Sequence, residues 1–516
     1  MKRRRLPIGT QSFRVLRGDG SYYVDKTAYI LKLLDEGRHY FLSRPRRFGK
    51  SLFLDTLREL FEGSESLFRG LHIHDRWDWS VRYPVVRLSF DHGLFYKPGY
   101  IHTNLTAQLD DLEQTAGVEP RHETGPERLA HLIRSLHRRS GQRTAVLVDE
   151  YDKPVLDALD EPEVAKANRD YLRGLYGVVK GCDEHIRFTF ITGVSKFSKV
   201  SLFSGLNSLE DITLDPRYSA ICGYTEADLD EVFAPELAGL DRDEIRRWYN
   251  GYRWRGTEGV YNPFDLLLLF KRREFEPHWF ETGTPTFLPE LLLRRRVGPP
   301  ELELMAADKD LLSKFDVGDI GTEALLFQTG YLTIKGERRE GWQTRYTLGY
   351  PNMEVRLALN KKLLQTMLPA AALRVADAAR LGALLTAGDL KGLERQLRKL
   401  FQSIPTDWHR KNKITEYEGY YAAVVLAWFH TQQLRAVAED SGSGGRADLT
   451  LLHERGTYVF EFKVAGRGAA ETALKQIKAK GYADKYLDAG RPVYLVGVEF
   501  SPETRNVERF DTERVQ

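Results

Sequence analysis

Cysteine is scarce in this chain, and long apolar segments are missing. The 516 residues include two cysteines, Cys182 and Cys222, which lie too far apart for zinc-ligand spacing and favour a reducing compartment. No apolar run approaches the roughly 18–20 residues that a membrane-spanning helix needs. The basic stretch Lys2–Arg5 has no apolar region behind it, so it does not predict a secretory signal. We therefore expect a cytoplasmic protein without a membrane segment.

The chain also has little net charge. Its 76 Lys and Arg residues against 73 Asp and Glu residues give +3. That balance excludes neither nucleic acid nor protein partners, because local patches matter more than the total. With 42% hydrophobic and 29% charged residues, the composition is that of an ordinary globular protein. The length allows about two to four domains.

A phosphate-loop motif near the N-terminus lacks its first glycine. Residues 39–51 predict a short apolar strand, a tight turn and a helix that opens with Gly49, Lys50 and Ser51. In that layout backbone N–H groups and a Lys bind phosphate, and the Ser hydroxyl binds Mg²⁺. The pattern G-x-x-x-x-G-K-[ST] places its first Gly where this chain has Arg44. Taken alone, the segment fits either a nucleotide site or an ordinary strand–helix connection.

Apolar strands alternate with helices through the N-terminal half. Tyr83–Phe90, Thr144–Glu150 and Arg187–Gly193 are strand-like runs separated by segments of helical spacing. This alternation indicates a parallel α/β sheet. The near-continuous apolar character of the strands fits a sheet that is covered on both faces.

One of these strands ends in an acidic pair, Asp149 and Glu150. At the carboxyl end of a strand, a Walker B Asp holds Mg²⁺ and the following Glu can polarise the attacking water. Thr192 ends the next strand, where a polar residue could sense the γ-phosphate, although an ordinary strand-end Thr is an equal alternative. Together with the Lys-Ser loop, the acidic pair predicts ATP and Mg²⁺ binding. Whether ATP is hydrolysed or only bound stays open.

At this point the chain resembles a known family. Residues 44–51 (RPRRFGKS), 149–154 (DEYDKP) and 190–197 (FITGVSKF) resemble the bacterial and archaeal AAA-ATPase-like family, whose members usually carry a C-terminal PD-(D/E)XK nuclease domain. The resemblance continues through residues 248–252, 261–264 and 328–331, so it covers nearly the whole chain. Arg44 matches the pattern of the family. The predicted nucleotide-binding set is Arg44, Arg46, Arg47, Gly49, Lys50, Ser51, Asp149 and Thr192.

The middle of the chain, residues 225–400, is mostly helical in pattern, with a small hairpin at 332–334 and 345–348. We expect a helical lid followed by a winged-helix-like unit. Two basic runs, 271–273 and 294–296, either contact phosphates or form solvated faces. No catalytic constellation is found in this region.

The second informative stretch is a hairpin near the C-terminus. Residues 444–452 and 457–464 are β-rich and flank a four-residue turn with Gly. In a symmetric register Asp448 faces Glu461, with Cβ atoms about 4.5–5.5 Å apart. Two carboxylates that close repel each other unless a proton or cation neutralises them, and Mg²⁺ or Mn²⁺ is the simplest choice. Lys463 follows on the same face, where it could position water or stabilise developing charge. Alternation puts the apolar side chains on the opposite face: Tyr458, Phe460, Phe462 and Val464.

Asp448…Glu461-Phe-Lys463 is the PD-(D/E)XK pattern. The resemblance implies two more residues: Gln476, in the Gln-x5-Tyr element of the following helix, and Glu418, an additional metal ligand on the upstream helix. Alternatives stay open, because Glu418 could be an exposed acid beside packed aromatics and the hairpin residues could form a structural ion-pair cluster. Four lysines either bind phosphates or form the polar face of a surface helix: Lys475, Lys478, Lys480 and Lys485.

The chain is therefore predicted to be an α/β protein in three parts. These are a P-loop ATPase domain (1–224), a helical and winged-helix-like region (225–400) and a restriction-endonuclease-like PD-(D/E)XK domain (401–516). The predicted catalytic residues are Asp448, Glu461, Lys463 and Gln476 in the nuclease and Glu150 in the ATPase. The predicted metal ligands are Asp448, Glu461, Glu418, Ser51 and Asp149.

We expect ATP and Mg²⁺ or Mn²⁺ as cofactors, nucleic acid as a partner, and a homo-oligomer as one possible assembly. The resemblance implies DNA as substrate and a role in defence against mobile DNA. A rival prediction is a nucleotide-dependent switch or scaffold whose nuclease-like domain grips nucleic acid or protein without cleaving it.

Overall fold

A computed structural model describes most of the chain. It describes residues 3–196, 208–278, 287–295, 297, 302, 305–308, 311–312, 321–341, 343–367, 378–402, 418–432, 434–442, 445–465 and 472–515. Phe197, Arg296 and Gly444, which belong to segments named above, lie outside these ranges. The chain divides into two compact units, Met1–Trp279 with Ala306–Asn352, and Phe280–Met305 with Met353–Gln516. The predicted domain boundaries after 224 and 400 stay predictions.

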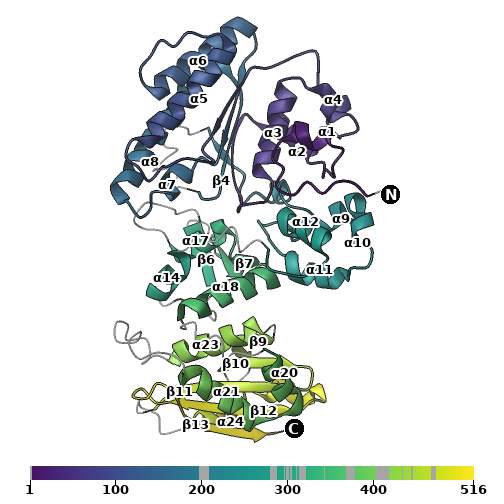
Figure 1. Ribbon diagram of the computed structural model, residues 1–516, viewed down its shortest axis with the longest axis vertical. Coiled ribbons are helices and arrows are strands. Elements are labelled where there is room, and N and C mark those ends of the chain that lie inside the picture. Colours follow the sequence, from purple (N-terminus) through teal and green to yellow (C-terminus); the bar gives the residue numbers. More distant parts are fainter. Residues whose placement is uncertain are drawn as a thin grey trace. The chain divides into compact units, whose positions relative to one another are not determined.

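A five-stranded parallel sheet forms the centre of the first unit (Figure 1). Its strand order is β2-β3-β4-β1-β5. The strands are β1 (His39–Ser43), β2 (Val85–Ser89), β3 (Thr144–Asp149), β4 (Ile186–Gly193) and β5 (Glu210–Asp211). Every residue of β1 and β3 is buried. The prediction of a parallel α/β sheet is confirmed, and the burial of its central strands fits a sheet covered on both faces.

Helices cover this sheet on both sides, as Figure 1 shows. One side carries α1 (Phe13–Gly18), α2 (Thr27–Glu36), α3 (Lys50–Phe61) and α4 (Glu65–Phe68), and the other carries α5 (Tyr100–Ala116), α6 (Gly125–Ser140) and α8 (Pro162–Gly181). The short α7 (Lys153–Leu156) follows β3, and three 3₁₀ turns are η1 (His74–Arg76), η2 (Asp183–His185) and η3 (Pro216–Tyr218). In α3 the buried Phe53, Leu57 and Leu60 recur at helical spacing, which turns one face of the helix to the core.

The rest of the first unit is helical with one small sheet. Its helices are α9 (Glu226–Val232), α10 (Ala234–Leu237), α11 (Arg242–Tyr249), α12 (Pro263–Arg272) and α17 (Thr322–Thr329). α9 begins with a capping box in which Thr225 and Asp228 bond each other's backbone N–H groups. The small sheet has the order β6-β8-β7, with β6 (Met305–Asp308), β7 (Thr333–Glu340) and β8 (Gln343–Gly349). β7 and β8 pair antiparallel, which confirms the predicted hairpin.

The second unit holds a mixed five-stranded sheet in the order β13-β12-β11-β10-β9. Its strands are β9 (Arg435–Gly442), β10 (Gly445–His453), β11 (Gly456–Val464), β12 (Val493–Phe500) and β13 (Val507–Arg514). β11 and β12 are parallel, and the other neighbours are antiparallel. The helices are α14 (Phe287–Arg294), α18 (Met353–Met367), α20 (Ala378–Ala387), α21 (Leu390–Gln402), α23 (Glu418–Thr431) and α24 (Ala473–Lys480), with the 3₁₀ segment η5 (Asp484–Ala489).

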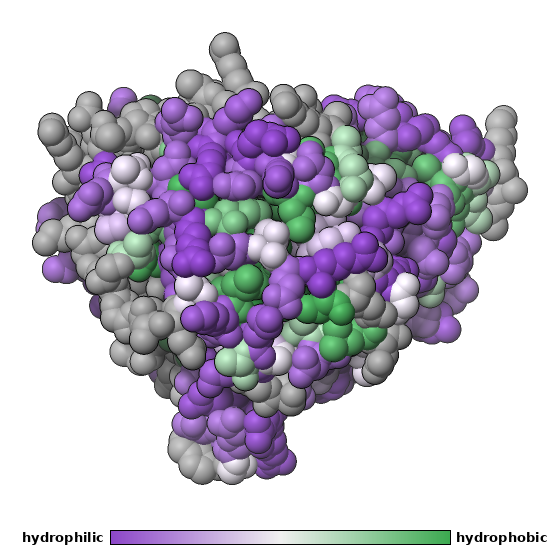
Figure 2. Space-filling view, turned by 90° about the horizontal axis from the view of Figure 1, so that it is seen from below, coloured by the Kyte–Doolittle hydropathy of each residue, from purple (hydrophilic) through white to green (hydrophobic). Residues whose placement is uncertain are grey.

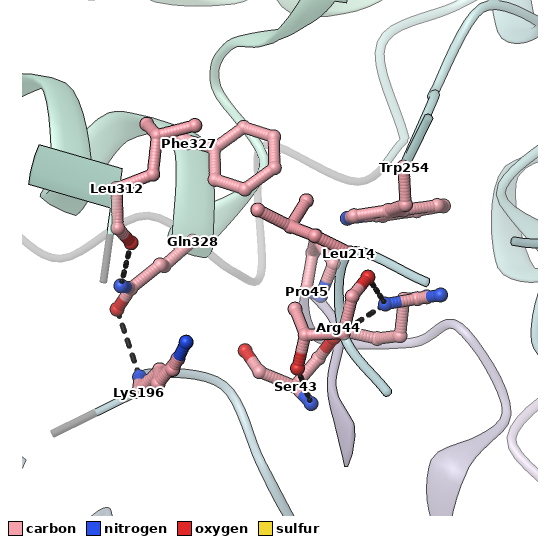
Figure 3. Close-up of a pocket in the computed structure, with 10 residues that line it drawn as sticks. Ser43, Arg44, Pro45, Lys196, Leu214, Trp254, Leu312, Phe327 and Gln328 are labelled. Carbon is pink, nitrogen blue, oxygen red and sulfur yellow. Dashed lines mark hydrogen bonds between the residues drawn. The ribbon is translucent and has the colours of Figure 1, made fainter. Parts of the chain in front are cut away.

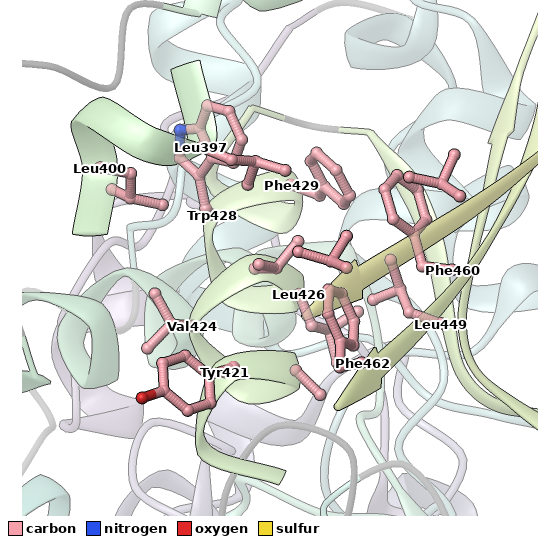
Figure 4. Packing of buried hydrophobic residues seen from close by; sticks show 14 of the residues in the cluster. Leu397, Leu400, Tyr421, Val424, Leu426, Trp428, Phe429, Leu449, Phe460 and Phe462 are labelled. Carbon is pink, nitrogen blue, oxygen red and sulfur yellow. The ribbon is translucent and has the colours of Figure 1, made fainter. Parts of the chain in front are cut away.

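The core of this unit is built around α23. Residues 421–429 are all buried, because the sheet packs on one side of the helix while α18 and α21 pack on others. A helix that is apolar all round is a buried helix. Figure 4 shows α23 side chains such as Leu426 and Phe429 against Phe460 and Phe462 of β11. The prediction that these two phenylalanines lie on the same face of β11, opposite Val459, is confirmed.

The opposite face of the sheet carries α24, with Val459 of β11 in the same cluster as Ile477. The face of the molecule seen in Figure 2 is mostly hydrophilic, with apolar side chains in separate patches. None of the helices in the described ranges combines the length and apolarity that a membrane span requires.

Candidate nucleotide and nuclease sites

The turn between β1 and α3 has the shape of an anion-binding loop. Gly49 stands at the start of α3 with a φ of 91°, which few residues besides glycine adopt. The next residue, Lys50, is buried, and its Nζ donates to the carbonyl oxygens of Arg44 and Pro45, both at 2.9 Å. Burial lowers the pKa of Lys50, while the nearby Glu150 carboxylate acts in the opposite direction. A cation and a helix N-terminus therefore lie together, as phosphate binding requires.

The end of β3 brings carboxylates to this loop. Asp149 is 2% exposed and accepts a hydrogen bond from the Ser51 hydroxyl. Its Oδ1 also accepts the N–H of Glu150 at 3.0 Å. Burial raises the pKa of both Asp149 and Glu150. The structure thus joins the two predicted Mg²⁺ ligands of this site, and their oxygen donors fit that ion.

Glu150 adopts a left-handed backbone conformation, with a φ of 48°. Such strain costs about 1–3 kcal/mol for a residue other than glycine and persists where the surrounding structure holds it. The next two residues tie this turn to the end of β4. The N–H of Tyr151 donates to the carbonyl of Thr192 at 3.2 Å, and the Asp152 carboxylate accepts the N–H of Ser195 at 2.6 Å. Sequence reasoning assigned Asp152 to a family motif without giving it a role.

Arg44 lies beneath the loop with its guanidinium fully buried. It donates to the carbonyl oxygens of Ser43 (2.8 Å), Thr213 (3.0 Å) and Tyr218 (3.1 Å). The guanidinium also lies over the Trp254 ring, 4.2 Å from its centre (Figure 3). Burial lowers the pKa of Arg44 to about 10. These contacts give Arg44 a structural role and lend no support to the predicted direct contact with a nucleotide.

Two other predicted nucleotide-binding residues, Arg47 and Thr192, also contact other parts of the protein. Arg47 has a φ of 70° and its guanidinium stacks on Phe264 at 3.7 Å. The Thr192 hydroxyl donates to the carbonyl of Leu42 at 2.9 Å. This bond joins β4 to β1 and fits the ordinary strand-end alternative. Arg46 is exposed at the loop surface.

The motif at residues 328–331 packs against the loop from α17. Gln328 accepts the N–H of Lys196 at 2.9 Å and donates to the carbonyl of Leu312 at 2.8 Å, beside a pocket with room for about one water (Figure 3). A Cβ at Gly330 would lie 2.7 Å from Cβ of Pro45, so only glycine allows this approach. Sequence reasoning noted the motif but could not place it against the loop.

The C-terminal hairpin has the predicted register. The pairs run outward from the turn as far as Leu449 and Phe460, one step short of Asp448 and Glu461. Beyond that point the Asp448 carboxylate accepts the backbone N–H of Phe462 at 2.7 Å. Because Phe462 stands between Glu461 and Lys463, this bond ties Asp448 to the strand segment that carries both.

A helix that packs on this face of the sheet binds Glu461. Glu461 of β11 is 4% exposed, and the Gln476 amide of α24 donates to its Oε1. The same amide group of Gln476 lies 3.4 Å from the Tyr482 hydroxyl. The structure therefore brings together Glu461, Gln476 and the tyrosine of the Gln-x5-Tyr element.

The carboxylates of Asp448 and Glu461 are the hard oxygen donors that Mg²⁺ and Mn²⁺ prefer. Glu418 is the first residue of α23, and its side chain lies outside the described residues. Within the described part of the chain no group of three or more His, Cys, Asp or Glu side chains is arranged to hold a metal. The metal role of Glu418 stays a prediction.

Two of the four lysines near this face have carboxylate partners. Lys478 lies 2.9 Å from Glu513, and Lys485 pairs with the buried Asp440 of β9. Tyr486 also donates to Asp440, at 2.7 Å. These pairs favour a structural reading of Lys478 and Lys485 over phosphate binding.

Comparison with known proteins agrees with the predicted family. Residues 7–203 match the family described as "Predicted AAA-ATPase", and residues 416–510 match the PD-(D/E)XK nuclease superfamily. The chain is also similar to a protein of Azotobacter chroococcum mcd 1 described as "Uncharacterized protein in vnfD 5'region". The two are 56% identical over 514 residues, which cover 99% of each.

Proposed function

Because the chain belongs to the AAA-ATPase-like family that carries a C-terminal PD-(D/E)XK nuclease domain, we propose that it is an ATP-binding, Mg²⁺-dependent nuclease that cleaves DNA. The observation that carries the proposal is the bond from Phe462 N–H to the Asp448 carboxylate. It ties Asp448 to the strand segment that carries Glu461 and Lys463, which supports the proposal. We further propose that ATP hydrolysis controls the cleavage.

In the nuclease, Asp448 and Glu461 would hold the divalent ion, with Glu418 as a further ligand. When bound, that ion supplies positive charge near the scissile phosphate and lowers the pKa of water. Gln476 orients Glu461 through its hydrogen bond. The Lys463 ammonium positions the attacking water or stabilises the negative charge that develops on the phosphate.

In the ATPase, the backbone at Gly49 and the Lys50 ammonium bind the phosphates. Ser51 and Asp149 would hold the Mg²⁺ that accompanies ATP. Glu150, in its strained turn at the end of β3, orients the attacking water. Hydrolysis, cytoplasmic location, oligomeric state and a role in defence stay predictions of the sequence.

The nuclease assignment is tested by incubating the purified chain with duplex and single-stranded DNA and RNA, with and without Mg²⁺ and ATP. We expect Mg²⁺-dependent cleavage of DNA that Asp448→Ala abolishes. Glu513→Ala is the matched control, since it removes a partly exposed carboxylate, paired with Lys478, from the same sheet. Cleavage by Asp448→Ala at the wild-type rate would show that the assignment is wrong. Nucleic acid that is bound without cleavage by the wild type would favour the scaffold alternative.

The nucleotide site is tested by the ATP affinity of Lys50→Ala. Hydrogen bonds to charged groups contribute about 1.5–3 kcal/mol, so we expect binding about 10- to 100-fold weaker than wild type. Lys166→Ala, at an exposed position of α8, is the control and should bind ATP normally. Unchanged ATP affinity in Lys50→Ala would remove the basis for the ATPase half of the proposal.

A further inference from the structure

Asp152 stands at the start of α7 but does not cap that helix. Its side chain makes no cap hydrogen bond and is directed to the end of β4 instead. There its Oδ2 accepts the N–H of Val194 at 3.1 Å, the N–H of Ser195 at 2.6 Å and the hydroxyl of Ser195 at 2.5 Å. At 1% exposure, the carboxylate is a buried clamp between two loops at the same edge of the sheet.

The clamp closes the turn that begins at Asp149. The Tyr151 hydroxyl donates to the carbonyl of Ser195 at 3.0 Å, next to the bonds of Asp152. A Cβ at position 193 would lie 2.3 Å from Oδ1 of Asp152 and 2.6 Å from Cδ1 of Tyr151, so the close approach depends on Gly193. Glu150, with its left-handed backbone, directly precedes these bonded residues.

The position is electrostatically costly for a carboxylate. Burial raises the pKa of Asp152, and Asp149 and Glu150 are acidic neighbours in the same turn. The Lys50 ammonium is the cation that favours its charged form. An amide at this position keeps an oxygen for the Ser195 donors, but its NH₂ group would face the Val194 N–H, which Oδ1 of Asp152 accepts at 3.3 Å. The arrangement therefore favours an acceptor-only group.

We propose that Asp152 is a positioning residue of the ATP site, which holds the turn at the end of β3 against β4 and thereby aims the Glu150 carboxylate at the attacking water. The proposal rests on the ATPase half of the proposed function. It assigns Asp152 no contact with ATP. Its loss is therefore expected to slow hydrolysis and leave ATP binding nearly unchanged.

The test compares ATP affinity with the single-turnover hydrolysis rate in Asp152→Asn. A misplacement of about 1 Å can cost about 100-fold in rate, so we expect hydrolysis about 10- to 100-fold slower at nearly wild-type ATP affinity. Glu150→Gln should slow hydrolysis as well. The double variant should be no slower than Glu150→Gln alone, because residues that act as a unit are not additive. A purely structural role would lower affinity and rate together.

Two further variants keep the test decisive. Ser195→Ala removes the hydroxyl donor and keeps both backbone donors, so it should fold and slow hydrolysis less than Asp152→Asn. Asp157→Asn, which removes a carboxylate that pairs with Lys153 in α7, should hydrolyse ATP at the wild-type rate. Wild-type hydrolysis rates in both Asp152→Asn and Ser195→Ala would overturn the positioning role of Asp152 but not the ATPase. The same holds if the rate losses of Asp152→Asn and Glu150→Gln multiply in the double variant. A wild-type chain that binds ATP without hydrolysing it would overturn the ATPase as well.

Discussion

We expect the stability of the second unit to depend on pH through His430. Its imidazole is buried between α18 and β9, where Asn360 Nδ2 lies 2.6 Å from Nδ1 and the Ala436 carbonyl lies 3.1 Å from Nε2. An amide NH₂ can donate to Nδ1 only when that nitrogen carries no proton, and Nε2–H then donates to Ala436. Burial lowers the pKa of His430 to about 3, and the positive charge of Arg356 adds to the effect.

The size of the effect follows from proton linkage. In the unfolded chain a His titrates near pH 6.5, so between about pH 6.5 and 3 the unfolded state binds the proton that the folded state excludes. Stability is therefore fully present above pH 6.5 and is lost as the pH falls. The loss amounts to about 1.4 kcal/mol at pH 5.5 and about 2.7 kcal/mol at pH 4.5.

Amide hydrogen exchange of α18 and α23 in the full chain measures this loss where it arises. Wild type and His430→Phe are compared with each other at pH 7.5 and again at pH 5.5. The intrinsic exchange rate at each pH is the same for both proteins and cancels in the comparison. We expect His430→Phe to be less protected at pH 7.5, because it leaves Asn360 and Ala436 without their partner. From pH 7.5 to 5.5 the protection of wild type should fall about tenfold relative to that of the variant.

The matched control is His453→Gln, at the β10–β11 turn of the same unit. It should keep most of the wild-type dependence on pH. If wild type and His430→Phe lose the same protection between pH 7.5 and 5.5, the imidazole is not the group that takes up the proton, and the reasoning from its burial fails.

Three further outcomes follow from the two sites. Arg44→Gly restores the usual phosphate-loop pattern but removes three hydrogen bonds to carbonyl oxygens, so we expect a loss of about 3 kcal/mol or more and a clearly lower Tm, whereas Arg46→Gly at the exposed neighbour should change Tm little. Asp448→Asn keeps an oxygen for the Phe462 N–H and should unfold at nearly the wild-type Tm while its DNA cleavage is lost. A fall in both Tm and cleavage would instead indicate a structural role for Asp448. Gln476→Ala should slow cleavage about 10- to 100-fold and raise the Mg²⁺ concentration that cleavage needs, and an unchanged Mg²⁺ requirement would argue against an action through Glu461.

Local patterns were enough to predict much of the second unit. The register of the β10–β11 hairpin and the shared face of its apolar side chains Tyr458, Phe460, Phe462 and Val464 follow from a short symmetric turn and period-two alternation, and both are confirmed. The symmetric turn also predicted that Asp448 and Glu461 stand directly opposite each other. The described pairs end one step earlier, at Leu449 and Phe460, so this opposition stays a prediction. The bond from the Phe462 N–H to the Asp448 carboxylate could not be predicted, because alternation does not indicate which backbone group a side chain binds.

Contacts between distant segments could not be predicted from the sequence. Asp152 precedes a short helix, where an acid usually caps, and nothing local indicates that it binds Val194 and Ser195. Likewise, the Thr192 hydroxyl could be directed to a nucleotide or to its own sheet, and only the pairing of β4 with β1 decides between them. In both cases the residue type allows two partners and the tertiary structure selects one.

Arg44 shows how far a motif pattern can mislead about a side chain. The pattern marks position 44 as a phosphate contact or as a lost glycine, yet the guanidinium bonds the carbonyls of Thr213 and Tyr218 and lies on Trp254. Phe48 packs edge-on against Trp254 as well, which fixes the loop from a second point. The shape of the phosphate loop is therefore set partly by residues some 170–210 positions later in the chain. It follows that the proposed ATP site is not formed by the β1–α3 segment alone, and that changes around Trp254 should alter nucleotide affinity without touching the nucleotide.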